Sequence, residues 1–203
     1  MGADKALMPL VDGGPPMLTL VLERLRDVAV EVTVVANEAE RYARFGSPVV
    51  PDVHADIGPL GGIHAALSHA AHDHCLIVAC DMPFLSAGLL HRMASEPRDF
   101  DVLVPVLPGE SRQGRQGGVL QTLHAIYSKR CLPHIASRIR DGHRQVIGFF
   151  DDVVVRTIEV DEIKTWDPEL RSFFNANTPE TLAAAAAMAK EEEHIPGEMR
   201  SSL

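Results

Sequence analysis

Asp81 ends an apolar run, residues 76–80, and is followed closely by Pro83. A run of this kind, rich in β-branched residues, predicts a central parallel strand that is covered on both faces. Asp81 then lies at the carboxyl end of that strand, the edge at which open α/β sheets bind ligands, and its carboxylate is well placed to hold a divalent cation. Capping a turn or the next helix is the alternative role for an isolated aspartate at this position.

Other polar residues follow predicted strands in the same way. They are Asn37, Asp52, Asn175 and Asn177. Because parallel strands bring their carboxyl ends to one edge of a sheet, we expect these side chains to face a single crevice together with Asp81. Amide and carboxylate groups form directional hydrogen bonds, so Asn37 and Asp52 are candidates for reading a base edge or ribose hydroxyls. Each residue also suits an ordinary turn.

Two glycines and a lysine complete the candidate site. Gly61 and Gly62 precede a predicted helix, where a ligand can approach the backbone closely and where amide N–H groups favour an anion or a carbonyl-rich ring. Lys5 stands beside Asp4 in a glycine-containing loop and is a candidate partner for phosphates. A plain loop and a solvated surface lysine are the alternatives.

These residue types together indicate magnesium-assisted nucleotidyl transfer. A triphosphate needs its charge neutralised before an anionic nucleophile can attack the α-phosphorus, and one cation with one lysine would supply that charge. We therefore expect Mg²⁺ as cofactor, Asp81 as its ligand, and Lys5 and Asp81 as the catalytic residues. No protein nucleophile is required.

The elements that must position these residues alternate between strand and helix along most of the chain. Strands are expected at residues 28–36, 48–50, 76–80, 101–107, 119–127 and 152–160, and helices at 16–26, 38–45, 63–70, 86–93, 128–140 and 179–190. This alternation predicts an α/β fold, a three-layer, Rossmann-like, mostly parallel sheet with helices on both faces. A loop with Arg112 and Arg115, residues 109–118, is expected to lie over a pocket.

Composition restricts the class of protein. The 203 residues suit one domain over 1–190 and a flexible charged tail over 191–203. The net charge of −9, without a basic run, argues against nucleic acid as a partner but not against nucleotides. No apolar run reaches the roughly 20 residues of a membrane span, and three cysteines at irregular spacing indicate reduced thiols, so we expect a cytoplasmic protein.

Other chemistries find less support. His69, His72 and His74 could suggest a metal site, but they fall at a predicted helix end without partners at zinc spacing. The G-x-S-x-G elbow of a hydrolase and the G-x-G-x-x-G fingerprint of a dehydrogenase are both missing from the sequence.

Four motifs, in order and spacing, resemble those of the molybdenum cofactor guanylyltransferase family. They are Met1-Gly2-Ala3-Asp4-Lys5-Ala6-Leu7, Gly58-Pro59-Leu60-Gly61-Gly62-Ile63, Cys80-Asp81-Met82-Pro83-Phe84 and Asn175-Ala176-Asn177-Thr178-Pro179-Glu180. The segment Leu123-His124-Ala125-Ile126-Tyr127 is similar as well. The likeness covers nearly the whole chain up to the alanine-rich helix.

The resemblance implies a nucleotide-diphospho-sugar-transferase-like fold that joins GMP from GTP to molybdopterin with Mg²⁺ and releases pyrophosphate. By matching positions, Lys5 would contact the GTP phosphates, Asn37 and Asp52 the guanosine, and Asp81 both magnesium and nucleotide. Asn175 and Asn177 would lie toward molybdopterin, the acceptor. Molybdoenzyme maturation proteins are implied as further partners.

Two departures from the family pattern matter. In the family, an apolar first strand and a Leu-Ala-Gly-Gly loop, which should bind the triphosphate, come just before the Met-Gly. This sequence begins at that Met-Gly and so shows neither of them. The second departure is Glu38, which stands where relatives often carry Arg. We therefore expect the chain as written to bind GTP poorly. A related transferase that uses CTP or another acceptor, a non-catalytic nucleotide- or molybdopterin-binding protein, and a structural or protein-interaction domain remain the alternatives.

Overall fold

The computed structural model describes residues 4–109 and 118–194, and within it the chain forms two compact units. The first unit comprises Met1–Val30, Ala79–Ala94 and Asp161–Leu203, and the second comprises Glu31–Val78 and Ser95–Val160. The arginine-containing loop at 110–117 and the last nine residues of the predicted tail lie outside the described residues. The prediction of one domain over 1–190 stays a prediction.

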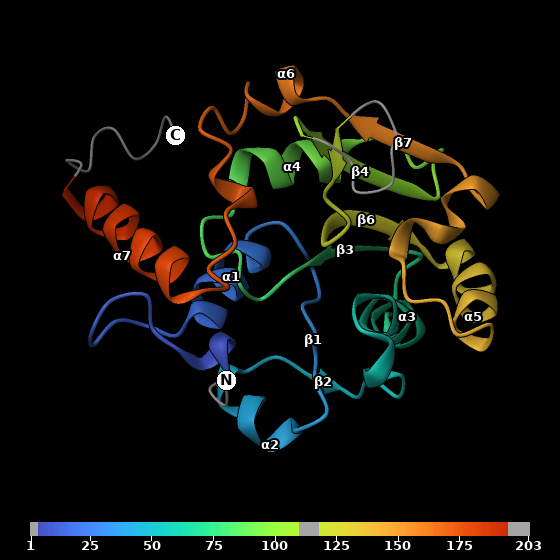
Figure 1. Ribbon diagram of the computed structural model, residues 1–203, viewed down its shortest axis with the longest axis horizontal. Coiled ribbons are helices and arrows are strands. Elements are labelled where there is room, and N and C mark those ends of the chain that lie inside the picture. Colours follow the sequence, from blue (N-terminus) through green and yellow to red (C-terminus); the bar gives the residue numbers. More distant parts are fainter. Residues whose placement is uncertain (1–3, 110–117, 195–203) are drawn as a thin grey trace. The chain divides into compact units, whose positions relative to one another are not determined.

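The second unit is built on a five-stranded mixed sheet (Figure 1). Its strands are β3 (His74–Val78), β4 (Val102–Leu107), β5 (Val119–Leu120), β6 (His124–Ser128) and β7 (Val155–Ile158). β6 lies between β3 and β4 and is antiparallel to both, so β3 and β4 run in the same direction. β7 adds to β4 in parallel and β5 in antiparallel orientation. The single strand predicted over 119–127 is in fact two strands. A turn separates them, in which the Gln121 carbonyl accepts a hydrogen bond from the His124 amide.

Two helices pack against one face of this sheet, α3 (Pro59–His69) and α5 (Leu132–Arg140), as Figure 1 shows. Every second residue of β4 and β6 points toward them, which the period of two in a strand requires. The core there contains Leu60 and Ile63 of α3, Val102 and Val104 of β4, Ala125 and Tyr127 of β6, and Ile135 of α5, all fully buried. The 3₁₀ helices η4 (Lys129–Cys131) and η5 (Val146–Asp152) flank α5 and add Cys131 and Phe149 to that core.

The strand before Asp81 differs from its prediction. All five residues of β3 are half-buried rather than covered on both faces, and the strand pairs in antiparallel orientation with β6. Among the described residues, β6 is the only strand hydrogen-bonded to β3, so the other edge of β3 has no neighbouring strand there. An apolar run therefore marks a strand here but not a central parallel one.

A separate parallel pair, β1 (Val34–Val35) with β2 (Val49–Val50), belongs to the same unit. The strand predicted over 28–36 is mostly irregular, because Val30 is 91% exposed and only its end pairs. Between the two strands lie α2 (Ala39–Tyr42) and η2 (Ala43–Phe45), and Gly46 ends η2 in the left-handed conformation, as glycine commonly does after a helix. The short η3 (Ala55–Ile57) precedes α3.

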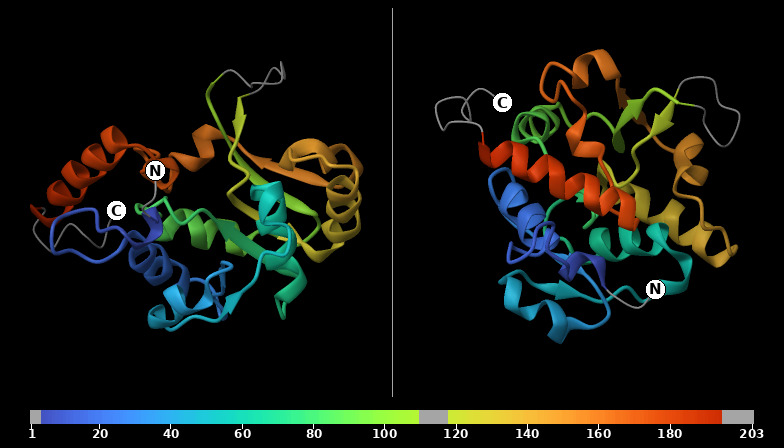
Figure 2. Two further views of the ribbon diagram at one scale, coloured as in Figure 1. Left: turned by 60° about the horizontal axis from the view of Figure 1, so that its bottom comes forward. Right: turned by 60° about the vertical axis from the view of Figure 1, so that its left-hand side comes forward.

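The first unit is largely helical. It contains η1 (Lys5–Leu7), α1 (Met17–Arg26), α4 (Ala87–Ser95, except its last residue), α6 (Val160–Ile163, except its first), η6 (Arg171–Phe173) and α7 (Pro179–His194). Figure 2 shows α1 in blue and α7 in red side by side, and their buried Met17 and Ala185 share one apolar cluster with Phe84. α7 continues four residues beyond the predicted end at 190, so the tail predicted to be flexible begins as helix.

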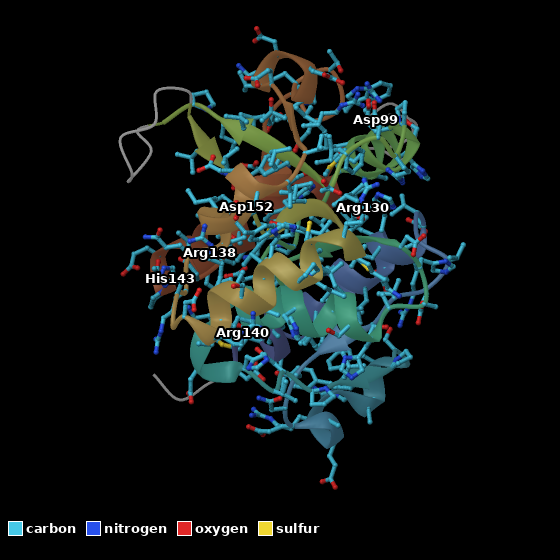
Figure 3. The ribbon with its side chains drawn as sticks, turned by 90° about the vertical axis from the view of Figure 1, so that its right-hand side faces the viewer. Asp99, Arg130, Arg138, Arg140, His143 and Asp152 are labelled. Atoms are coloured by element: carbon cyan, nitrogen blue, oxygen red, sulfur yellow. The ribbon has the colours of Figure 1, made fainter. Side chains whose placement is uncertain are left out.

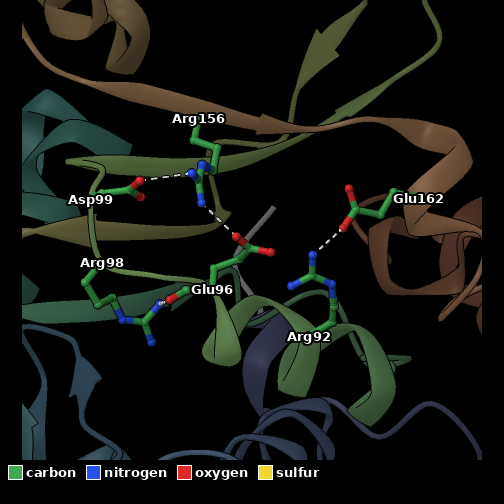
Figure 4. A network of polar contacts seen from close by, with 6 residues as sticks. All are labelled: Arg92, Glu96, Arg98, Asp99, Arg156 and Glu162. Carbon is green, nitrogen blue, oxygen red and sulfur yellow. Dashed lines mark hydrogen bonds and ion pairs between the residues drawn. The ribbon is translucent and has the colours of Figure 1, made fainter.

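Ion pairs secure the ends of elements in each unit (Figure 4). In the second unit, Arg156 of β7 donates to Glu96 at 2.8 Å and to Asp99 at 3.1 Å. In the first unit, Arg92 of α4 donates to Glu162 of α6 at 2.8 Å. None of the described helices is both long and apolar enough to cross a membrane.

Candidate functional site

The first unit brings four of the predicted site residues together. Asp4 begins η1 by accepting a hydrogen bond from the Ala6 amide, which places Lys5 in the first helical position. The Lys5 ammonium donates to the main-chain carbonyl of Asn177, although 172 residues separate the two in sequence. The Ala176 amide in turn donates to the Asp81 carbonyl at 2.9 Å. Lys5, Asp81, Asn175 and Asn177 therefore belong to one constellation.

Apolar packing holds this constellation in place. Ala176, which stands between the two asparagines, is buried in the same cluster as Leu10 and Phe84. The rings of Phe84 and Phe174 meet edge to face with centroids 6.1 Å apart. Because the short segment around Ala176 is anchored on both sides, the polar groups of its neighbours are held without needing a helix or strand of their own.

The Asp81 carboxylate is available for a ligand. It is half-buried, and among the described residues no hydrogen bond or ion pair engages its oxygens. Desolvation of the thiolate is the main cause that raises the pKa of Cys80 to about 11. The carboxylates of Asp81 and Asp4 act in the same direction, and Lys5 opposes them. One lysine and two carboxylates thus surround this point of the unit.

The described residues contain no group of three or more His, Cys, Asp or Glu side chains that could by itself hold a metal ion. A dedicated protein cage is therefore not formed there, and the histidines at positions 69, 72 and 74 do not form one. Mg²⁺ commonly relies on only one or two carboxylates, with water and substrate phosphates completing its shell. The open Asp81 carboxylate fits this second type of site.

The second unit brings together three other predicted residues. Asn37, just after β1, accepts a hydrogen bond through Oδ1 from the Asp52 amide at 2.8 Å. Asp52, just after β2, accepts one through Oδ1 from the His54 amide at 2.8 Å. A Cβ atom placed on Gly61 would stand 3.0 and 3.1 Å from the two carboxylate oxygens of Asp52 and 2.5 Å from the His54 carbonyl oxygen. Glycine at position 61 is thus required for this close approach.

The two glycines differ from their prediction in one respect. They lie inside the first turn of α3 rather than in a loop before it, because Gly58 adopts a φ of +72° and Pro59 then occupies the first helical position. Gly62 faces open space, since a Cβ atom placed on it would meet no other atom within 4 Å. That space beside a helix amino terminus can admit an anionic or carbonyl-rich group.

Sequence reasoning did not single out two histidines near Asp52. The ring of His64, on α3, meets that of His54 edge to face with centroids 5.1 Å apart. Desolvation is the main cause that lowers the pKa of His64, His54 adds to it, and Asp52 opposes it. The signal was weak, because a histidine two positions after an aspartate and another inside a helix are both common arrangements.

The predicted residues thus form two sets, Lys5, Asp81, Asn175 and Asn177 in the first unit and Asn37, Asp52 and Gly61 in the second, with Gly62 beside the latter. That all of them face a single crevice stays a prediction.

Comparison with known proteins identifies the family of the chain. Residues 1–154 match the model of a family described as the MobA-like NTP transferase domain. The chain belongs to this family. A probable molybdenum cofactor guanylyltransferase from Pelotomaculum thermopropionicum is 38% identical over 94% of the chain and 87% of that protein. A molybdenum cofactor guanylyltransferase from Desulfosudis oleivorans is 33% identical over 93% of the chain and 89% of that protein. The family resemblance inferred from the four motifs is confirmed.

Solved structures support the fold of this MobA-like transferase. A molybdopterin-guanine dinucleotide biosynthesis protein A from Archaeoglobus fulgidus aligns with a TM-score of 0.78 at 26% identity and covers 94% of the chain and 92% of that chain. A 2-C-methyl-D-erythritol 4-phosphate cytidylyltransferase from Thermus thermophilus, 22% identical, aligns with a TM-score of 0.67 over 92% of the chain and 94% of that chain. The α/β fold of nucleotide-diphospho-sugar transferase type is confirmed, and the chain is a nucleotidyltransferase by family.

Proposed function

We propose that the chain transfers GMP from GTP to molybdopterin and releases pyrophosphate. A phosphate oxygen of molybdopterin forms a bond to the α-phosphorus of GTP, and the bond from that phosphorus to the oxygen bridging to the β-phosphate breaks. The guanine dinucleotide form of the cofactor and pyrophosphate are the products. The relatives named as guanylyltransferases, at 38% and 33% identity, support this choice of substrates.

The observation that carries the proposal is the joining of Lys5 and Asp81 through the segment around Ala176. We assign Lys5 to the triphosphate, where its positive charge stabilises the charge that develops on the leaving pyrophosphate. We assign Asn175 and Asn177 to the acceptor, because they flank the same anchored segment. Asn37, Asp52, Gly61 and Gly62 are assigned to the guanosine part of GTP.

Mg²⁺ is part of the proposal, with Asp81 as its protein ligand. When bound, the ion would neutralise phosphate charge and align the triphosphate. The open carboxylate of Asp81 supports this assignment, and an ion held mainly by phosphates and water needs no larger group of protein ligands. We also propose that the protein acts in the cytoplasm, and that proteins which mature molybdoenzymes receive its product.

The test is pyrophosphate release by the purified chain with molybdopterin, Mg²⁺ and GTP, with CTP and ATP in parallel, and the product identified by mass. We expect the chain to use GTP. Asp81→Asn should lower the rate of pyrophosphate release at least about a hundredfold. Asp161→Asn, which makes the same charge change at an exposed carboxylate of the same unit, should keep the full rate. Release with CTP alone would replace the guanylyl assignment by a cytidylyl one.

Thermal melting separates binding from catalysis. GTP with Mg²⁺ at 100 times its dissociation constant would stabilise the native chain by about 2.7 kcal/mol. Stabilisation without pyrophosphate release would indicate a non-catalytic nucleotide-binding protein, and no response to any nucleotide would remove the support for transfer.

A further inference from the structure

A basic pocket lies in the second unit, among residues that the proposed transfer does not use. It has a volume of about 440 Å³ and is lined by Arg138, His143, Arg144, Gln145 and Gly148. Arg138 belongs to the last turn of α5. His143, Arg144 and Gln145 follow between α5 and η5, and Gly148 lies in η5 itself. In Figure 3, Arg138, His143 and Asp152 gather at this end of α5, while Arg140 leaves the helix lower in the view.

The geometry of the chain turn builds this pocket. Gly142 takes a φ of +74° just after α5, and its amide donates to the Ile139 carbonyl at 3.0 Å. The His143 amide then donates to the Arg138 carbonyl at 2.9 Å, which folds the segment back over the helix end. The imidazole of His143 and the guanidinium of Arg138 therefore line the same depression.

The positive charge of the pocket is poorly neutralised. Asp152 is the one carboxylate in ion-pair range of a lining residue in the described parts of the chain, and its oxygen lies 3.6 Å from Nη2 of Arg138. Arg144 and His143 are exposed and make no ion pair within those parts. In a chain with a net charge of −9, the exposed guanidinium of Arg144 and the guanidinium of Arg138, held among the described residues only by the long ion pair with Asp152, give the cavity a locally positive lining.

The last turn of α5 contains Arg138 and Arg140, and the favourable interaction of positive charge with the carboxyl end of a helix dipole explains both. It does not explain Arg144 and His143, which follow the helix, nor the cavity itself. Gly148 also keeps the cavity open. A Cβ atom placed on Gly148 would lie 4.0 Å from Nε of Arg138, so the lack of a side chain at position 148 leaves one side of the guanidinium uncovered.

We propose that this pocket binds the phosphoryl group of an anionic ligand. Arginine presents planar, forked N–H groups that match phosphate and carboxylate oxygens in pairs. Two guanidinium charges match the double negative charge of a phosphoryl group, whereas a single carboxylate would neutralise only one. Gln145 and His143 supply further hydrogen-bond donors to its remaining oxygens. The ligand is either free phosphate or pyrophosphate, or a phosphate ester.

The test is calorimetric titration of the full chain, without Mg²⁺, with inorganic phosphate, pyrophosphate and glycerol phosphate. We expect saturable binding that Arg144→Ala weakens by about tenfold or more, the effect of losing a charge-assisted hydrogen bond. Arg140→Ala is the matched control, because it removes the same charge from the same region but does not line the pocket, and it should leave the affinity within about twofold.

Two more variants keep the result from depending on one substitution. Gly148→Glu places a carboxylate beside the Arg138 guanidinium and should abolish binding, whereas Asp152→Asn frees that guanidinium and should strengthen binding. Phosphate or pyrophosphate binding more tightly than glycerol phosphate assigns a free anion, and the reverse order assigns an ester.

The proposal is overturned if Arg140→Ala and Arg144→Ala weaken binding equally, since general surface charge would then account for it. It is also overturned if no phosphate compound binds, or if an acidic peptide binds while all three compounds do not. Pyrophosphate release from GTP is measured on the same variants and should not change, because none of them belongs to the residues assigned to transfer.

Discussion

The Asp52 carboxylate occupies the place that a side chain on Gly61 would need, with its two oxygens 3.0 and 3.1 Å from the position of a Cβ. The contact joins the segment after β2 to the first turn of α3. At Gly61, unlike at Gly62, the neighbouring atoms leave no room for a side chain, so glycine is needed there in spite of its low helix propensity.

Two alanine substitutions on α3 should therefore have opposite effects. Gly61→Ala forces a Cβ against the His54 carbonyl and should destabilise the fold by about 1–3 kcal/mol, the usual cost of overpacking. Gly62→Ala meets no atom within 4 Å and should stabilise it by about 0.5–1 kcal/mol through helix propensity. Urea unfolding measures both, and equal effects would contradict the close approach. Under the proposed function, Gly62→Ala should also weaken GTP binding despite its stabilising effect.

Asp101 connects three elements of the second unit. Its carboxylate is largely buried, accepts from Nε of Arg130 at 2.5 Å, and accepts from the Val154 amide at 2.8 Å. Asp101→Ala removes both hydrogen bonds and should cost about 1–2 kcal/mol in the free energy of unfolding, because the exposed Arg130 can bond to water instead. Asp99→Asn, on a carboxylate that is 63% exposed, should change it by less than about 0.5 kcal/mol. A small effect of Asp101→Ala in chemical denaturation would remove this residue from the stabilising contacts.

Stability should fall in mild acid because of two histidines. Desolvation is the main cause that lowers the pKa values of His64 and His74 below 6.5, so the unfolded chain binds protons that the folded chain resists. Their contribution is fully present above pH 6.5 and is lost as the pH falls from there toward the lowered values. His74→Phe keeps an aromatic contact with Phe100 and should flatten this dependence, whereas His72→Gln, on an exposed residue, should not. Unfolding curves between pH 8 and pH 5 show whether the slopes differ.

Leu170 has a φ of +56°, in the left-handed region, and stands just before η6. The carboxylate of Asp167 accepts hydrogen bonds from the amides of the two residues after Leu170, Arg171 and Ser172. Leu170→Asn should be tolerated within about 0.5 kcal/mol, because asparagine enters this region readily and its side chain replaces one that is only half-buried. Leu170→Val should cost about 1–2 kcal/mol, because a branched Cβ is disfavoured there. Equal stability of the two variants in thermal unfolding would be inconsistent with this backbone conformation.

Local signals in the sequence were sufficient for most of the longer helices and for several caps, but not for α6 or for the first turn of α3. Gly46, Gly142 and Thr178 stand where the structure ends or begins helices, because each acts on backbone groups only a few residues away. The pairing of Lys5 with Asn177 was reachable only through the motif resemblance, since no local pattern relates residues at opposite ends of a chain. The antiparallel insertion of β6 between β3 and β4 was missed because strand order depends on long-range pairing.

Some site details could not be read from residue types. Asn37 and Asp52 were each compatible with a simple turn, and it is the hydrogen bond from the Asp52 amide to Asn37 that joins them. Gly61 was predicted for its openness to a ligand, but the structure shows that it is needed for packing against Asp52, while Gly62 faces open space. The pocket at the end of α5 combines residues that are ordinary one by one.

α3 constrains this region from two sides at once. Leu60 and Ile63 are fully buried against the sheet, while Gly61, between them, touches the segment after β2. A rotation of the helix that made more room beside Gly61 would withdraw the two large side chains from the interior. Adaptation of the first turn to a different ligand therefore cannot proceed by moving the helix, and it must come from substitutions in the segments around it.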